Sequence, residues 1–209
     1  MIINLLFSEP VFFLIWLAAI LIGITIHEFS HAFAANLAGD PTAKNSGRLT
    51  LNPLAHLDLW GLLFLLLVGF GYGKPVPVNP YNLKNQKWGE VFVSAAGPLS
   101  NLAQIFIFGL ALKFLAFLGP ENLLVYFLFT LIYINIILMV FNLIPVPPLD
   151  GSKILMKILP PSLDNFKLRL EKSGPMILLF IIILDRILNL GLFAGLFNFF
   201  SQAIFRIFG

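Results

Sequence analysis

The sequence predicts an all-α polytopic membrane protein. Hydrophobic residues make up 59% of its 209 residues and charged residues only 11%, whereas a soluble domain carries about 25% charged residues. The mean hydropathy is +0.94, and several apolar stretches are long enough to cross a lipid bilayer as helices. The length suits one compact domain, so we expect a single integral-membrane domain over residues 1–209.

Three long apolar stretches are the expected core helices, at residues 11–38, 91–118 and 123–144. Each one reaches the roughly 20 residues that a spanning helix needs. A further stretch, 59–73, is too short to cross and ends in GFGYG. We interpret it as a re-entrant element, built either as a hairpin of short strands or as a short helix and a loop. Membrane depth tolerates such an element only where protein or water satisfies its backbone.

The C-terminal part of the sequence predicts further helices, over about 153–172 and 176–208. Asp185 and Arg186 interrupt the second of these. Adjacent residues do not face each other on a helix, so this charged pair indicates a membrane boundary. The stretch could form one span plus a surface helix, or two short spans.

The basic residues predict the orientation of the chain. If residues 59–73 do not cross the bilayer, ten of the 13 Lys and Arg residues fall on one side, which the positive-inside rule makes cytoplasmic. If the stretch crosses, this bias disappears. We therefore expect a multi-pass protein of the plasma membrane. The basic residues are scattered and form no stripe with interleaved aromatics, so we expect no nucleic acid partner.

The first core stretch contains the motif H-E-x-x-H, formed by His27, Glu28 and His31. Residues four apart lie about 40° apart on a helix, one turn from each other, so both imidazoles project from one face with Glu28 beside them. This spacing lets two ring nitrogens share a zinc ion while the carboxylate reaches the attacking water. Ionisable groups are costly at membrane depth, so the cluster indicates a metal site in use. The absence of cysteine excludes thiolate ligands.

A catalytic zinc site usually has three protein ligands, so one ligand must come from outside this motif. The stretches 91–118 and 123–144 cross the membrane twice and return the chain to the side where the first helix ends. Asp150 emerges there, after three prolines that cannot continue a helix and can direct it into the bundle. The other candidates are Asp40, His56, Asp58, Glu90, Asp164, Glu171 and Asp185. His56 could instead contact substrate or cap a helix.

A further polar residue, Asn101, lies in SAAGPLSNLAQ near the expected cytoplasmic start of its span. An asparagine within the membrane needs a partner, and small residues such as Gly97 let helices approach closely. Asn101 therefore either holds helices together or offers an amide to a substrate carbonyl or oxyanion. The residues alone leave both interpretations open.

Taken together, HEFSH, AGPLSN and NLIPVPPLDG resemble the motifs of the site-2 protease family of intramembrane zinc metalloproteases, in the same order and spacing. GRLTLNPLAHLD and KPVPVNP resemble its compact prokaryotic branch, which lacks a PDZ domain. The resemblance implies zinc ligands at His27, His31 and Asp150, a general base at Glu28 and an accessory catalytic contact at Asn101. It also implies a three-helix catalytic core with the active site towards the cytoplasm. Unlike in relatives, we expect no helix before the metal-binding one.

The expected function is hydrolysis of peptide bonds in or near transmembrane segments of proteins anchored in the lipid bilayer. Single-span proteins or signal-peptide-like segments would be the substrates. Zinc would polarise the carbonyl, and Glu28 would move a proton from water to the leaving amine. An unwound substrate could pair as an extra strand with residues 59–73 or 74–82. The alternative is an ion or proton transporter that uses the same cluster, which predicts metal-dependent flux without cleavage.

Overall fold

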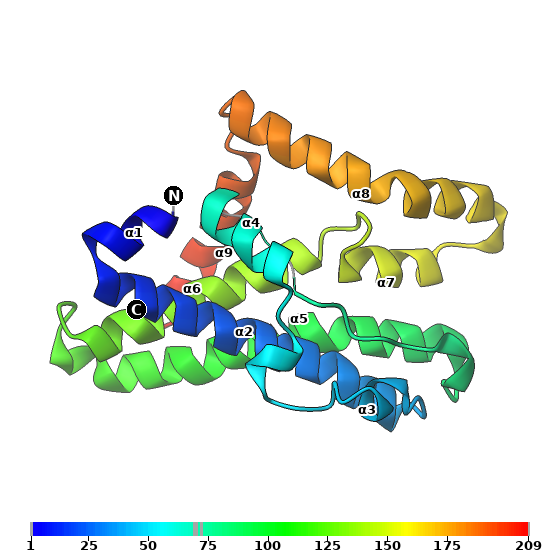
Figure 1. The fold of residues 1–209 in the computed structure, drawn as a ribbon, viewed down its shortest axis with the longest axis horizontal. Helices are drawn as coiled ribbons and strands as arrows, with labels where there is room; N and C mark the ends of the chain where they lie inside the picture. Colours follow the sequence, from blue (N-terminus) through cyan, green and yellow to red (C-terminus); the bar gives the residue numbers. More distant parts are fainter. Residues whose placement is uncertain (1, 69–70, 72, 209) are drawn as a thin grey trace.

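The computed structural model describes residues 2–68, 71 and 73–208, and within these ranges every regular element is a helix (Figure 1). Within the described residues, three single helices are long and apolar enough to cross a membrane, and a bent pair of helices over residues 161–208 passes the same test when taken together. The three single helices are α2 (Pro10–Leu37), α5 (Gln86–Leu115), which a 3₁₀ turn extends to Leu118, and α6 (Leu123–Asn142). The predicted all-α membrane fold is therefore confirmed.

The three long helices pack side by side into one bundle (Figure 1). Ala19 and Ile20 of α2 share an apolar cluster with Leu131 and Ile134 of α6, and small residues such as alanine let helix backbones approach closely. A short turn containing Gly119 joins α5 to α6, and the φ of this glycine is +82°, a conformation that glycine adopts at little cost. The bundle forms the scaffold for the polar residues predicted to act together.

The connection between α2 and α5 contains one further apolar helix, α4 (Leu59–Val68). It begins after Asp58, whose carboxylate accepts a hydrogen bond from the Gly61 N–H at 2.9 Å. The N–H of Lys74 donates to the carbonyl of His56 at 2.9 Å, so the chain returns to the place from which it departed. A helix of ten residues is about 15 Å long, half the thickness of the hydrocarbon core.

This geometry fits a re-entrant element, and it selects the helix-and-loop alternative over the strand hairpin for residues 59–68. Leucine, a strong helix former, explains this, because six of the ten residues of α4 are leucine. Residues 69, 70 and 72 of the predicted GFGYG reversal lie outside the described residues.

The C-terminal helices have bounds that differ from the predicted 153–172 and 176–208. They are α7 (Asp150–Ile158), α8 (Asp164–Ile187) and α9 (Leu192–Phe208). The predicted break near residue 174 is wrong, because α8 continues through Pro175. The chain breaks instead at Pro160 and Pro161, which restrict the residues before them, and at residues 188–191.

The second break places α9 at 90° to α8. Asn189 and Gly191 both have positive φ there, and the side chain of Asp185 accepts a hydrogen bond from the N–H of Leu192 at 2.7 Å. The charged pair at residues 185–186 therefore marks the corner between two helices. α9 packs on the bundle through Phe193 and Phe197, whereas α8 lies at the edge of the molecule (Figure 1).

A short helix, α1 (Ile2–Ser8), precedes α2, although we expected no helix before the metal-binding one. Pro10 starts α2, because its missing N–H and fixed φ suit the first position of a helix. Glu9, whose backbone is not helical, separates the two helices. The seven residues of α1 are too few to cross a membrane, and α1 contacts α4.

Candidate metal centre

Three side chains from two distant parts of the sequence meet at one point. The Nε2 atoms of His27 and His31 lie 3.1 Å apart, and Oδ2 of Asp150 lies 3.3 Å from the first and 3.0 Å from the second. All three residues are buried. Ligands about 2.0–2.1 Å from a tetrahedral zinc ion lie roughly 3.3 Å apart, so the spacing and the donor atoms fit zinc.

The end of α6 and the start of α7 bring Asp150 to the histidines. The two helices are joined by the proline-rich segment 143–149, and Asp150 is the first residue of α7. A side chain at Gly151 would collide with the backbone carbonyl of Leu143. Glycine at this position therefore lets α7 start directly against the end of α6. This close approach places Asp150 next to His27 and His31 of α2.

Two lysines of α7 form ion pairs near the site, one with Asp150 and one with α5. Lys153 lies 3.1 Å from Oδ1 of Asp150, which leaves Oδ2 for the histidines, and Lys157 pairs with Glu90 of α5 at 2.7 Å. Burial alone would raise the pKa of Asp150, but protons on the Nε2 atoms of His27 and His31, which a metal ion would replace, and the charge of Lys153 lower this pKa well below its usual range. The carboxylate is therefore ionised, as metal binding requires.

The Nδ1 atom of His31 has a partner that fixes its protonation. It lies 2.7 Å from the carbonyl oxygen of Val93 in α5. A carbonyl can only accept, so Nδ1 carries the hydrogen and donates it. The lone pair of Nε2 is then directed at the metal position, which is the usual arrangement for a histidine ligand.

Two asparagine amides fix the position of the hydrogen on His27, as the Val93 carbonyl does for His31. The carbonyl of Leu131 can only accept, so Nδ2 of Asn135 donates to it at 2.8 Å. Oδ1 of Asn135 accepts from Nδ2 of Asn101 at 2.7 Å, and Oδ1 of Asn101 accepts from Nδ1 of His27 at 2.6 Å. Both asparagines are completely buried. This chain of three hydrogen bonds, here called the asparagine relay, leaves the Nε2 lone pair of His27 free for a metal.

Gly97 lets α5 approach the metal ligands. A Cβ atom at this position would lie 2.6 Å from Nε2 of His27 and closer still to Nε2 of His31. Any side chain there would occupy the space in which His27, His31 and Asp150 can hold a metal ion. The small residue that the sequence suggested for helix packing is thus required by the site itself.

Glu28 lies half-buried next to His27 in the sequence and close to Gly73 of the segment that returns from α4. A methyl group at Gly73 would lie 3.5 Å from Oε1 of Glu28. The buried Arg48 holds this segment, because its guanidinium donates to the carbonyls of Lys74 and Pro75. Within the described part of the chain no hydrogen bond engages the Glu28 carboxylate, so it can act on a water molecule.

The remaining candidate ligands lie outside this group: Glu171 is exposed on α8, and the others have partners elsewhere. Asp40 accepts hydrogen bonds beside the short helix α3 (Thr42–Asn45), Asp58 and Asp185 cap helices, and Glu90 and Asp164 pair with lysines. His56 is completely buried, and its Nε2 atom lies 2.8 Å from the carbonyl oxygen of Thr50. It is the C-cap residue of the 3₁₀ turn Pro53–Ala55, so of its possible roles the structure shows the cap.

Sequence reasoning missed Asn135 as a positioning residue. The rule that a membrane asparagine needs a partner was applied to Asn101, and it applies equally to Asn135 within the apolar run LIYINIIL. The structure shows that the two asparagines are each other's partners. The role of Asn101 as a substrate contact stays a prediction, since both of its side-chain polar atoms are engaged within the protein.

Known proteins match this chain over most of its length. The model of peptidase family M50 matches residues 119–184. Three relatives share the name "Putative zinc metalloprotease". YwhC of Bacillus subtilis is 40% identical over 74% of each chain. Rip2 of Mycolicibacterium smegmatis is 30% identical over 90% of this chain and 74% of its own. MJ0611 of Methanocaldococcus jannaschii is 31% identical over 73% of this chain and 77% of its own.

The chain belongs to peptidase family M50. The resemblance to site-2 proteases is confirmed, and this M50 peptidase is a metalloprotease with zinc as its metal. No solved structure gave a significant match. The family supports the protease over the ion transporter that the sequence left as an alternative, and the group formed by His27, His31 and Asp150 can hold the metal ion.

Proposed function

We propose that this M50 peptidase hydrolyses peptide bonds in or near the transmembrane segments of membrane-anchored proteins. The observation that carries this proposal is the position of the candidate metal centre. Its two histidines and Glu28 lie within α2, a helix of membrane length, and Asp150 joins them beside the end of α6. A site built into spanning helices serves substrates that lie in the same membrane.

In this proposal His27, His31 and Asp150 would hold the zinc ion. As a Lewis acid, the bound ion would polarise the scissile carbonyl and make water more acidic. Glu28 takes a proton from the attacking water and passes it to the leaving amine. The asparagine relay and the Val93 carbonyl hold the two imidazoles in orientation. Hydrolysis adds water across the peptide bond and needs no further reactant.

The proposed substrates are single-span membrane proteins or signal-peptide-like segments. A transmembrane helix hides its carbonyl groups in its own hydrogen bonds, so the substrate must unwind where it is cut. The cytoplasmic side of the plasma membrane is the proposed location of the site. The concentration of basic residues in the segments next to the site, such as Lys153 and Lys157, supports this orientation.

Replacing Glu28 with glutamine tests the mechanism. The purified E28Q variant should retain zinc and lose cleavage of a single-span test substrate by at least about 100-fold, the lower range for a general base. E121Q is the matched control, because Glu121 is exposed in the turn between α5 and α6. Zinc-loaded E28Q that cleaves at the wild-type rate would show that the proposed mechanism is wrong.

Single cysteines can test the orientation, because the chain has none of its own. Cysteines replacing Lys84 and Lys167 should react with an impermeant reagent only from the cytoplasmic side, and a cysteine replacing Glu121 only from the other side. Labelling of residues 84 and 167 from opposite sides would contradict the re-entrant interpretation of α4.

A further inference from the structure

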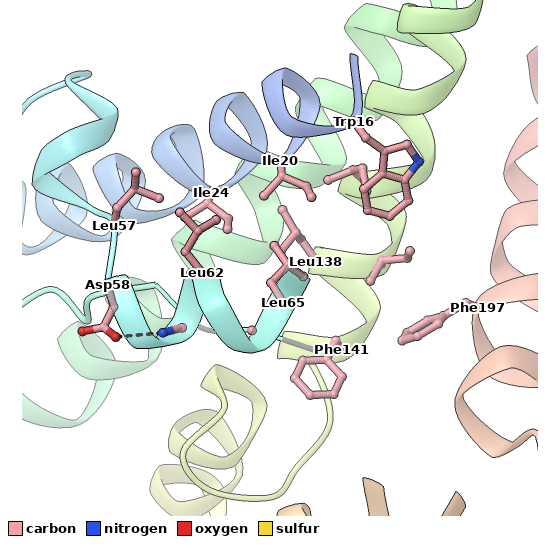
Figure 2. Close-up of a pocket in the computed structure, with 14 residues that line it drawn as sticks. Trp16, Ile20, Ile24, Leu57, Asp58, Leu62, Leu65, Leu138, Phe141 and Phe197 are labelled. Carbon is pink, nitrogen blue, oxygen red and sulfur yellow. Dashed lines mark hydrogen bonds between the residues drawn. The ribbon is translucent and has the colours of Figure 1, made fainter. Parts of the chain in front are cut away.

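An apolar cavity of about 160 Å³ lies between α2, α4 and α6 (Figure 2). Ile20 and Ile24 of α2, Leu62 and Leu65 of α4 and Leu138 of α6 are among the residues that form its walls. Packed protein interiors contain few voids larger than a water molecule. A space of this size between three helices therefore points to an occupant.

The cavity reaches the catalytic face of α2. Ile24 precedes Glu28 by four residues, so the two side chains lie one above the other on the same face of the helix. A methyl group at Gly73 would lie 3.4 Å from Ile24 and 3.5 Å from Oε1 of Glu28. The backbone at Gly73 thus borders both the wall of the cavity and the carboxylate that acts on water.

The walls select for an uncharged, apolar group. Figure 2 shows the side chains of Ile20, Ile24, Leu62, Leu65 and Leu138 around the space. Asp58 is the one charged side chain among the described residues that line it, and its carboxylate is engaged by the N–H of Gly61. An apolar cavity of about 150 Å³ holds one benzene molecule, so this one has room for one aromatic ring or one leucine side chain.

We propose that this cavity is a specificity pocket that receives one large apolar side chain of the substrate, phenylalanine or leucine, close to the scissile bond. The inference rests on the proposed function of the site next to it. Four residues of helix separate Ile24 and Glu28 by about 6 Å, a distance that an extended peptide covers in about two residues. The selected side chain therefore lies about two residues from the bond that is cut.

The return segment from α4 completes the pocket. A side chain at Gly71 would collide with the carbonyl of Gly61 and with Leu65, so the backbone at Gly71 lies directly on α4. Gly71 and Gly73 then form a border between the pocket and Glu28. An extended substrate that passes Gly73 can place its carbonyl near the metal ligands and its apolar side chain in the pocket.

A substrate series can test the pocket. Two sets of single-span substrates are compared. In one set the residue two positions before the cleaved bond is Phe, Leu, Ala or Asp, and in the other set the residue two positions after it is varied in the same way. At one of these positions, wild-type enzyme should cleave the Phe and Leu substrates with kcat/KM about 10- to 100-fold above the Ala substrate, the range that an apolar pocket achieves. The Asp substrate should be cleaved more slowly than the Ala substrate.

Two variants of α4 provide a matched pair. L62W fills the pocket, whereas L63W makes the same change at a neighbouring residue that does not line it. L62W should lower the Phe-to-Ala ratio of kcat/KM to about 1, and L63W should keep the wild-type ratio. Equal cleavage of all four substrates by wild type, or an unchanged ratio in L62W, would overturn the pocket while leaving the protease intact. A zinc-loaded wild type that cleaves none of the substrates would instead overturn the proposed function.

Photo-crosslinking gives a second measurement that does not depend on turnover. The inactive E28Q variant is incubated with a substrate that carries benzoylphenylalanine at the selective position. Crosslinks should map to Leu65 or Leu138 and should be lost in L62W but not in L63W. Crosslinks outside the pocket walls would overturn the assignment.

Discussion

The metal centre and the α4 segment lie side by side in this protein, yet they are built differently. In the candidate metal centre, each imidazole has a fixed partner, and the two asparagines of the relay are completely buried. Beside them, α4 is separated from α2 and α6 by an apolar cavity, and its outer side chains, such as Phe64, are exposed.

The difference follows from what each region must do. A metal ion needs ligands held within a few tenths of an ångström, which hydrogen-bonded partners provide. A substrate that varies in sequence needs a wall that can yield, and a short helix over a cavity can move at a lower cost than a helix packed in the bundle core. The contrast predicts where mutations have large effects and where they have small ones.

The largest effect is expected at the metal ligand from α7. Asp150→Ala removes one of the three candidate ligands and leaves only the two histidines to hold the metal ion. We expect loss of bound zinc and of detectable cleavage, measured by metal analysis and with a single-span substrate. Asp164→Ala is the control, since Asp164 pairs with Lys167 away from the site. Full zinc content in Asp150→Ala would show that this residue is not a ligand.

The next largest effect, a loss of zinc affinity, is expected from mutations in the asparagine relay. Asn135→Leu leaves the Nδ2 group of Asn101 without its acceptor and frees Asn101 to turn away from His27. Loss of a partner behind a metal ligand typically costs 10- to 100-fold in metal affinity, and competition with a chelator can measure this. Gln104→Leu is the matched control, because Gln104 is also buried and the described structure shows no partner for its amide. Equal zinc affinity in both variants would contradict the relay.

The sequence predicted much of this arrangement because its strongest signals are local. Helical spacing places His27 and His31 on one face, and hydropathy marks the spanning segments. The two predicted crossings then bring Asp150 back to the side of the histidines. Each of these steps needs only the geometry of a helix and the thickness of a bilayer.

Other features depend on contacts that a sequence does not display. The continuous α8 contains Pro175, and the change from polar to apolar sequence near residue 174 gave the wrong break. The asparagine relay joins residues 34 positions apart, and Gly97 is required because the metal ligands lie beside it. The pocket arises from three helices that meet only in the folded chain.

A smaller effect, on kcat/KM, is expected from breaking the ion pair between α7 and α5. Lys157 and Glu90 form a partly exposed pair, and such pairs contribute about 0.2–1 kcal/mol. Lys157→Met should therefore lower kcat/KM by no more than about 5-fold, because α7 holds Asp150 less firmly. Lys167→Met, which breaks an ion pair on α8, should leave the rate unchanged. Equal losses in both variants would exclude a specific role for the α7 pair.

The smallest effect is expected on the outer face of α4. Phe64→Ala removes a side chain that is 53% exposed, so the free energy of unfolding should change by no more than about 0.5 kcal/mol. Ile132→Ala, at a completely buried position of α6, should cost about 2–5 kcal/mol because it leaves a cavity in the bundle. Denaturant unfolding in the same detergent compares the two. Similar losses would show that α4 is packed as firmly as the bundle, and the pocket wall would then be rigid and select one side-chain shape rather than adapt to several.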